Sequence, residues 1–175
     1  MSNEVVIRVT KQSDLPSLQT LYHEAFYVEN LFPLVVELLS DKQEALNLSA
    51  VKDGALIGHI AFTQCHASPE NISLALLGPI AVLRKYQRQG IGSLMIKTGF
   101  NILKKRGVNK ILVLGDPNYY GHIGFTEETS IRPPYSIPEK WKRAWQSITI
   151  TDYSVSPSGQ LKVTKAWQRQ ELWSE

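Results

Sequence analysis

The sequence predicts one mixed α/β domain with a mostly antiparallel central sheet, a splayed and bulged strand, and flanking helices. An Asp-Gly pair at residues 53–54 joins two strand-like runs, which is a strong hairpin signal because a tight turn there needs positive φ. A strand at residues 77–82 leads into a glycine-rich turn and a long helix. The 175 residues, of which 43% are hydrophobic, can bury a substantial core, and no repeat or linker divides residues 1–175.

The chain before the hairpin predicts a strand followed by helical cover. Residues 5–9 form a β-branched run that is typical of a strand. Residues 14–27 repeat apolar side chains at spacings of three and four, which indicates an amphipathic helix. The apolar segment 31–39 contains Pro33 and is either a short second helix or a covering loop. In many enzymes such a variable segment forms a wall of the substrate site.

The hairpin and the strand after it supply the antiparallel part of the sheet. Runs at 45–52 and 55–65 flank the turn, and residues 71–82 are a third antiparallel candidate. Gly78-Pro79 interrupts this third run, where proline removes a ladder donor and glycine often marks a bulge. We therefore expect a splayed strand whose free backbone groups face a cleft and need a partner.

The turn between this strand and the following helix has the features of an anion site. Its sequence is Gln87-Arg88-Gln89-Gly90-Ile91-Gly92. Free N–H groups and the helix dipole favour a negative charge at a helix N-terminus. The two glycines allow a phosphate to approach closely because no Cβ intervenes. Arg84, Lys85 and Arg88 add cations, so the turn predicts a phosphate-binding site.

The remaining elements follow from the same kinds of signal. The helix is expected to run to Arg106 and to end at Gly107, and the strand at 110–114 returns in a right-handed βαβ crossover. A proline-rich segment at 132–138 is expected to be irregular. The predicted buried stripe of the helix is Leu94, Met95, Thr98, Ile102 and Leu103. The predicted C-terminal elements are a short helix at 139–147 and strands at 148–155 and 161–167.

Composition and charge exclude several classes of protein. The net charge of +3 is mild and scattered, and without a basic stripe the sequence does not indicate a nucleic-acid partner. The single cysteine, Cys65, excludes an intramolecular disulfide and a cysteine-based zinc site, and we interpret it as a small buried hydrophobe. No signal-peptide pattern or apolar run of about 20 residues is present, so we expect a cytoplasmic protein without a membrane partner.

Three motifs in this order resemble the GNAT superfamily of N-acetyltransferases. The turn Gln87–Gly92 fits the family's Q/R-x-x-G-x-G/A pyrophosphate loop, after the supporting run Gly78-Pro79-Ile80-Ala81-Val82. Tyr120–Phe125 looks like the family's Tyr-x-x-x-Gly-Phe signature. The run Leu114-Gly115-Asp116-Pro117-x-Tyr119-Tyr120 is similar to a subgroup of bacterial members. A Rossmann motif needs a different glycine spacing in an alternating α/β chain, whereas here an antiparallel hairpin precedes the turn.

The resemblance implies transfer of an acetyl group from acetyl-CoA to a primary amine by direct attack in a ternary complex, without a metal. Backbone amides from Arg88 to Ser93 would hold the pyrophosphate, and main-chain groups of Ile80 and Val82 would pair with the pantetheine arm. The backbone N–H of Ile80 or Ala81 would stabilise the oxyanion. The implied cofactor-binding residues are Ile80, Ala81, Val82, Gln87, Arg88, Gln89, Gly90, Ile91, Gly92 and Ser93.

The resemblance also assigns the general acid. Tyr120 maps onto the tyrosine that protonates the leaving thiolate, and a phenol with a pKa near 10 can donate at neutral pH. The alternatives are that Tyr120 only packs the strand end, or that Tyr119 is the acid. Some members use a glutamate base on the long strand, but residues 72–82 contain no ionisable side chain. The other candidate bases are ordered water, His66, Glu70, Asp116 and His122.

Two other readings of the function stay open at this point. One is a non-catalytic acyl-CoA-binding module or regulator that keeps the fold, and the other is an enzyme with a macromolecular acceptor in place of a small-molecule or peptide amine. Acceptor identity depends on residues 22–40 and 126–175, where Tyr22 and His23 are candidates but no motif selects them. The tryptophans are expected to pack the C-terminal half; alternatively, one of them lines the acceptor pocket or the seam of a homodimer. These are Trp141, Trp145, Trp167 and Trp173.

Overall fold

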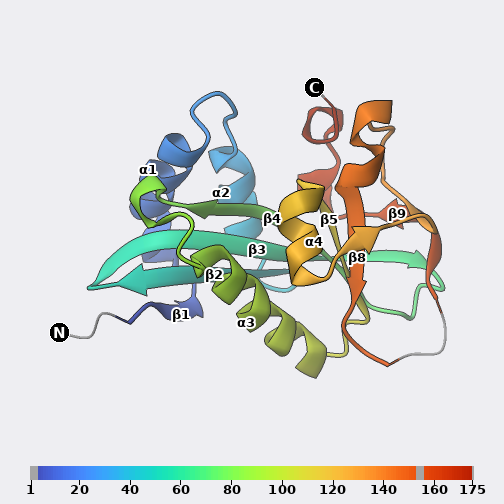
Figure 1. Cartoon of the computed structure of the whole chain (residues 1–175), viewed down its shortest axis with the longest axis horizontal. Helices are drawn as coiled ribbons and strands as arrows, with labels where there is room; N and C mark the ends of the chain where they lie inside the picture. Colours follow the sequence, from blue (N-terminus) through green and yellow to red (C-terminus); the bar gives the residue numbers. More distant parts are fainter. Residues whose placement is uncertain (1–3, 153–155, 175) are drawn as a thin grey trace. The chain divides into compact units, whose positions relative to one another are not determined.

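The computed structural model describes residues 4–152 and 156–174, and these divide into two compact units (Figure 1). Unit 1 contains residues 4–62 and 78–101, and unit 2 contains the others. Two strands and one helix contribute residues to both units, namely β3 (Ala55–Ser68), β4 (Leu74–Val82) and α3 (Ile91–Lys105).

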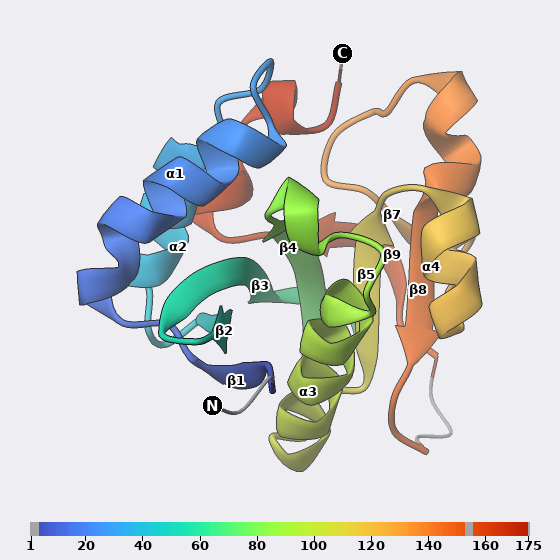
Figure 2. The ribbon, with the colours of Figure 1, turned by 60° about the vertical axis from the view of Figure 1, so that its left-hand side comes forward.

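Unit 1 consists of antiparallel strands covered by helices. β1 pairs with β2 in antiparallel register from Val6 opposite Val51 to Val9 opposite Leu48. α1 and α2 lie side by side in both ribbon views (Figures 1 and 2). Besides its parts of β3, β4 and α3, unit 1 holds β1 (Val6–Val9), the 3-10 turn η1 (Gln12–Asp14), α1 (Leu15–Ala25), α2 (Phe32–Ser40), β2 (Ala45–Lys52) and the 3-10 turn η2 (Arg84–Tyr86).

The hairpin prediction is confirmed. Asp53 and Gly54 have φ values of 51° and 78°, and a two-residue turn with both φ values positive matches the right-handed twist of its strands. β2 ends at Lys52 as predicted, but β3 continues beyond Cys65 to Ser68.

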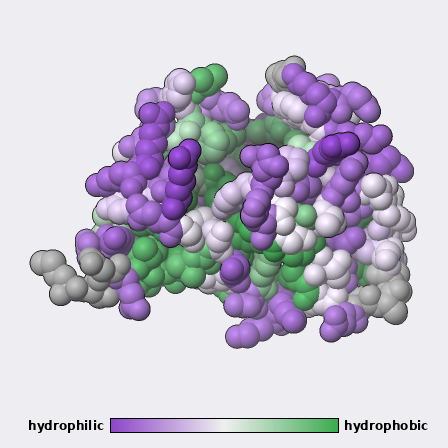
Figure 3. All heavy atoms as spheres, in the orientation of Figure 1, coloured by the Kyte–Doolittle hydropathy of each residue, from purple (hydrophilic) through white to green (hydrophobic). Residues whose placement is uncertain are grey.

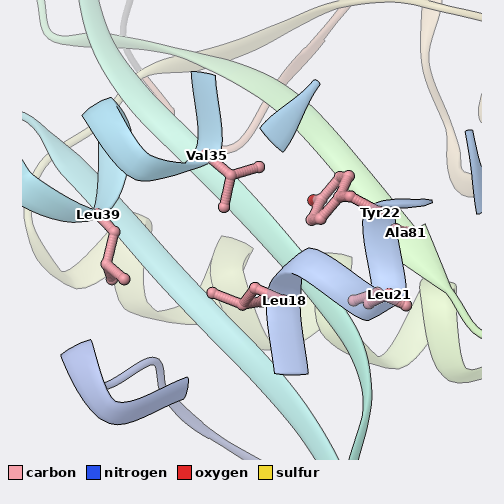
Figure 4. Close-up of a cluster of buried hydrophobic side chains, with 6 residues drawn as sticks. All are labelled: Leu18, Leu21, Tyr22, Val35, Leu39 and Ala81. Atoms are coloured by element: carbon pink, nitrogen blue, oxygen red, sulfur yellow. The ribbon is translucent and has the colours of Figure 1, made fainter. Parts of the chain in front are cut away.

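The core of unit 1 forms between α1, α2 and β4. Leu18, Leu21 and Tyr22 of α1 cluster with Val35 and Leu39 of α2 and with Ala81 of β4, and all six are buried (Figure 4). The spacing of the three buried α1 residues confirms the predicted amphipathic face. The segment predicted as either a helix or a loop is the helix α2, with its proline in the first turn, where a missing N–H costs no hydrogen bond.

The buried face of α3 agrees only in part with the predicted stripe. Met95 and Leu103 are buried as predicted, and Thr98 and Ile102 are half-buried. Leu94 is 42% exposed, whereas Ile96, which was not predicted, is fully buried. The reason lies at Gly99, where a Cβ would come within 2.2 Å of the Phe62 ring. A glycine at this position lets the phenyl ring pack directly on the helix backbone, which turns the Met95 face inward and Leu94 outward.

Unit 2 is built around a parallel pair of strands. β4 pairs with β5 in parallel over the first three residues of each strand, from Leu74 opposite Lys110 to Leu76 opposite Leu112, as a βαβ unit requires. β8 pairs antiparallel with β5 and β6, and β9 pairs with β3 and β7. Besides the shared elements, unit 2 holds β5 (Lys110–Leu114), α4 (Pro117–Ile123), β6 (Thr126–Glu127), β7 (Ile131–Arg132), η3 (Glu139–Ala144), β8 (Trp145–Thr149), β9 (Ser158–Lys162), η4 (Lys165–Trp167) and η5 (Gln170–Leu172).

The C-terminal predictions were wrong in their boundaries. The predicted helix at 139–147 is a 3-10 segment that ends at Ala144, because Trp145 already pairs with Leu114 of β5. β8 starts at Trp145 instead of residue 148 and ends at Thr149; the end of that predicted strand, residues 153–155, lies outside the described residues. The predicted strand at 161–167 is β9, which ends at Lys162 before a 3-10 turn.

Three tryptophans pack together in unit 2, as predicted. Trp145 and Trp167 both contact Trp173 edge to face, with ring centroids 5.8 and 6.0 Å apart. The Trp173 indole donates to the carbonyl of Trp167, and the Trp167 indole donates to the hydroxyl of Thr63. All three rings are buried, whereas Trp141 is half-buried.

A buried carboxylate ties the strands of unit 2 together. Glu128 accepts hydrogen bonds from the Ser147 hydroxyl and the Lys110 ammonium at Oε1, and from the amides of Ser130 and Ile131 at Oε2. Burial acts to raise the pKa of Glu128, but these donors lower it overall. The ionised form therefore stabilises the fold at pH values above the ordinary pKa of glutamate.

We expect Glu128→Gln to destabilise the protein by about 2–4 kcal/mol, because Lys110 keeps its charge and loses its buried partner. Urea denaturation at neutral pH measures the change, with the exposed neighbour substitution Glu127→Gln as the control. The loss should shrink as the pH falls through the lowered pKa, where the parent also loses the charge. Equal stability of the two variants at neutral pH would contradict the role of this carboxylate.

Among the described residues, no helix is long and apolar enough to cross a membrane. On the face in Figure 3, hydrophobic residues gather in separate groups among hydrophilic side chains.

Candidate active site

The predicted glycine turn lies in unit 1 between β4 and α3. Arg88 and Gly90 have φ values of 61° and 81°, and the space that a Cβ on Gly90 would enter is open to at least 4 Å. α3 is 15 residues long and carries no acidic side chain in its first turn. The first N–H groups of a helix have no intrahelical partner, so this end presents donors and the positive end of a dipole to an anion.

Two glutamine side chains brace the turn. Gln87 Nε2 donates to the carbonyl of Val82 at 2.9 Å, and Gln89 Nε2 donates to the carbonyl of Lys85 at 3.1 Å. The first bond ties the turn to the end of β4, and the second ties it to η2. The carbonyl of Val82 retains a second lone pair for a further donor. Both glutamines therefore hold the loop through its backbone.

Cations surround the turn more densely than the sequence indicated. Arg84, Lys85 and Arg88 are exposed, as expected for side chains that attract a polyanion. The ammonium groups of Lys85 and Lys52 lie 5.1 and 5.6 Å from the ring centroid of Tyr86. Sequence reasoning missed Lys52, because it comes from the end of β2 and only the hairpin turn brings it to η2.

The last residues of β4 lead directly into this turn. Ala81 is buried in the core of unit 1, whereas Ile80 and Val82 are half-buried. The alternation of a strand places Ile80 and Val82 on the opposite face from Ala81. A Cβ on Gly58 of β3 would lie 3.2 Å from the carbonyl of Ala81, so the glycine allows a close approach there. Unit 1 therefore brings together all ten residues predicted to bind the cofactor.

The predicted acid, Tyr120, lies in unit 2 on the helix α4, which the sequence analysis did not predict. Asp116 caps this helix by accepting from the amide of Asn118 at 2.9 Å, and Pro117 occupies its first position. Gly124 ends the helix with φ of 118°. An Asp-Pro start and a glycine end are standard helix signals that could have identified α4.

Tyr120 is buried within a cluster of aromatic rings. It is 7% exposed and contacts Tyr119 and Phe125 edge to face, while a Cβ on Gly115 would lie 2.3 Å from its ring. Burial, followed by the charges of Tyr119 and Asp116, raises the pKa of the phenol above its ordinary value. The hydroxyl therefore keeps its proton over the whole pH range in which enzymes are assayed. Tyr119 is 41% exposed.

Three of the four candidate bases have structural contacts. Glu70 is exposed and accepts a hydrogen bond from Lys162 at 2.6 Å, and Asp116 is the cap of α4. The His122 ring pairs with the carbonyl of Asn118. His66 differs from these, because its Nδ1 is buried without a hydrogen-bond partner. Cys65 is buried as predicted, and burial raises the pKa of its thiol, which does not suit a nucleophile.

A buried histidine that the sequence analysis missed lies in unit 1 on β3, the neighbour of β4 in the sheet. His59 of β3 is fully buried; its Nδ1 lies 2.7 Å from the hydroxyl of Tyr22, and its Nε2 lies 3.0 Å from Asn47 Oδ1. Asn47 donates its own amide to the carbonyl of Leu38, so Oδ1 is an acceptor and Nε2 of His59 carries the proton. Tyr22 then donates to Nδ1, which confines its hydroxyl to the interior.

This network predicts an acid-sensitive fold. Burial lowers the pKa of His59 to about 3, so the folded protein keeps the ring neutral while the unfolded chain protonates it below about pH 6.5. Stability should therefore fall as the pH drops from 6.5 towards 3, by up to about 1.4 kcal/mol per pH unit from this group. Urea denaturation between pH 6.5 and 4.5 measures the slope.

The matched substitutions are His59→Gln and His23→Gln, the latter on the exposed face of α1. The first should flatten the slope relative to the parent, and the second should leave it unchanged. A parent slope that survives in His59→Gln would show that other groups cause the acid sensitivity.

Among the described residues, no group of three or more histidine, cysteine, aspartate or glutamate side chains could hold a metal ion.

Comparisons with known proteins identify the family of the chain. The profile described as the acetyltransferase (GNAT) family matches residues 15–127. N-acetyltransferase YjhQ of Escherichia coli strain K12 is 32% identical over 161 residues, which cover 88% of this chain and 89% of YjhQ. N-acetyltransferase YhbS of the same strain is 31% identical over 122 residues, which cover 69% of this chain and 73% of YhbS.

Solved structures show the same relationship. The crystal structure of Escherichia coli YhbS in complex with CoA matches with a TM-score of 0.86 and 25% identity, covering 97% of this chain and 94% of that one. A GNAT family acetyltransferase from Brucella melitensis in complex with acetyl-CoA matches with a TM-score of 0.76 and 25% identity, covering 95% and 100%. The chain therefore belongs to the GNAT family of acetyltransferases, which confirms the fold and the acyltransferase class predicted from its motifs.

Proposed function

We propose that this protein transfers the acetyl group of acetyl-CoA to the nitrogen of a primary amine by direct attack in a ternary complex. The observation that carries the proposal is the open, cation-flanked N-terminus of α3, where Gly90 leaves room for a pyrophosphate. That two similar structures hold CoA or acetyl-CoA supports the choice of cofactor.

In this proposal the chain binds the donor mainly through its backbone. The amides from Arg88 to Ser93 take the pyrophosphate, and the Arg88 guanidinium adds charge. Ile80 and Val82 offer main-chain groups to the pantetheine arm, and Gln87 and Gln89 keep the turn in position. An N–H of Ile80 or Ala81 stabilises the oxyanion of the tetrahedral intermediate.

The chemistry then requires two proton movements. The neutral amine attacks the thioester carbonyl, the C–N bond forms, and the nitrogen loses its proton to water or to a base. As the C–S bond breaks, Tyr120 donates its phenolic proton to the leaving thiolate. Burial raises the pKa of Tyr120, so the phenol is protonated at the start of each turnover. A homodimer and a cytoplasmic location remain predictions from the sequence.

Calorimetric titration with acetyl-CoA, followed by an assay of thiol release with a panel of amines, tests the proposal. Micromolar binding together with amine-dependent release of one thiol per acetylated product is expected. Binding without release for any amine would favour the alternative, a non-catalytic acyl-CoA-binding module. No binding by the folded protein would overturn the cofactor assignment.

A further inference from the structure

The segment that joins α1 to α2 encloses a pocket in unit 1. Its walls come from residues 19–33 and enclose about 410 Å³, which lies in the range of small-molecule sites. The rings of Tyr22, Phe26, Tyr27 and Phe32 contribute to the lining. Tyr27 is 74% exposed, and the guanidinium of Arg84 lies over its ring, 5.7 Å from the ring centroid.

The pocket shares its core with the strand proposed to hold the thioester. Tyr22 and Ala81 belong to the same buried cluster (Figure 4). Phe26 and Phe32 pack against that cluster. The Tyr22 and Phe26 rings stack with centroids 6.0 Å apart. The hydroxyl of Tyr22 is hydrogen-bonded to His59, so Tyr22 lines the pocket with its ring and not with its hydroxyl.

The charge of this segment has the opposite sign to that of the cofactor turn. The chain carries a net charge of +3, yet residues 12–41 contain five carboxylates and no lysine or arginine. Asp14 is paired with Arg8, and Glu24 accepts the backbone amide of Arg84, whereas Glu29 lines the pocket. Of the lining residues, only His23 has a basic side chain. Arg84 lies outside this lining, over the Tyr27 ring, so the formal charge of the lining itself is that of Glu29 and favours a cation over an anion.

We propose, on the basis of the proposed function, that this pocket binds the acceptor and that the acceptor is a small primary amine on an apolar body about the size of an aromatic ring. The stacked rings take the apolar body, and an aromatic face also accepts a cation. Glu29 draws the ammonium form to the pocket before the nitrogen loses its proton and attacks. Acidic and phosphorylated acceptors fit this lining poorly, because Glu29 repels them.

Direct binding of probe amines tests the proposal independently of turnover. The probe is 2-phenylethylamine; 2-phenylethanol lacks the charge and n-propylamine lacks the ring. Calorimetry on the full chain with CoA present should give a Kd for the probe at least about tenfold below that of either analogue, as expected for a buried ring and a paired charge. The variants are Glu29→Gln and Tyr27→Ala, with Glu171→Gln, an exposed carboxylate of η5, as the control.

Both pocket variants should raise the Kd for 2-phenylethylamine about three- to tenfold, and the control variant should leave this Kd unchanged. Added salt should reduce only the effect of Glu29→Gln. The assigned acceptor class would be overturned if all three probes bound with equal affinity, or if neither variant changed the affinity for 2-phenylethylamine. The same samples are titrated with acetyl-CoA. If acetyl-CoA binds and the probe does not, the pocket inference fails alone; if the probe binds and acetyl-CoA does not, the proposed function fails.

Discussion

Replacing Gly90 by glutamate is expected to weaken acetyl-CoA binding by about 100-fold or more, because a carboxylate at the N-terminus of α3 repels a pyrophosphate at short range. The substitution should leave the fold intact, since nothing lies within 4 Å of the new Cβ. Its φ of 81° costs a side chain about 1–2 kcal/mol of stability. Calorimetric titration measures the loss of affinity directly.

Gly107 provides a matched control at the other end of the same helix. It has φ of 83° and equally open space around its Cβ position, so Gly107→Glu carries the same backbone strain and the same added charge. This variant should lose comparable stability and keep the parent affinity for acetyl-CoA. If both glutamates weaken binding equally, the effect comes from general destabilisation, and the pyrophosphate does not lie at Gly90.

Replacing Tyr120 by phenylalanine is expected to lower kcat by about 100-fold or more while the Kd for acetyl-CoA stays unchanged, because only the proton donor is removed. The ring still fills the space beside Gly115 and Phe125, so the stability of unit 2 should change little. Steady-state thiol release, with any amine that the parent accepts, gives kcat.

Tyr119→Phe is the matched control, since Tyr119 is the neighbouring phenol and the competing candidate acid. It should keep most of the parent activity. The pH profile adds a second criterion: the raised pKa of Tyr120 predicts no decline in rate near pH 10 from loss of this proton. Unchanged turnover in Tyr120→Phe, or a loss only in Tyr119→Phe, would reject the assignment.

The elements that the sequence predicted well depend on local signals. The hairpin follows from the conformation that Asp53 and Gly54 adopt, and the start of α3 follows from its glycine turn. The errors lie where pairing between distant strands decides the boundaries. Trp145 joins β8 because β5 pairs with it, and β9 ends where its pairing with β3 and β7 ends.

In the candidate site, too, the features with a local sequence signal could be predicted, and those that depend on distant residues could not. The residues predicted to bind the cofactor lie in two short runs, 80–82 and 87–93, so sequence motifs alone could single them out as candidates. His59 and Lys52 were missed because their partners come from other elements; 37 residues separate His59 from Tyr22. The motif also does not predict the role of Gln87, because its side chain donates a hydrogen bond to the backbone carbonyl of Val82, which any residue at position 82 could offer. The pocket lining has no motif, because it depends on how one loop folds back on α1.

The tryptophan cluster gives unit 2 a spectroscopic reporter of its own. All four tryptophans of the chain lie in unit 2, and three of them are buried against each other. Intrinsic emission during unfolding therefore follows unit 2, whereas protection by bound acetyl-CoA would follow unit 1. If tryptophan emission and a second probe that follows unit 1 give the same melting curve, one free energy of unfolding describes the whole chain. If the two curves differ, acetyl-CoA would raise the melting temperature of unit 1, and the melting temperature measured by tryptophan emission would not change.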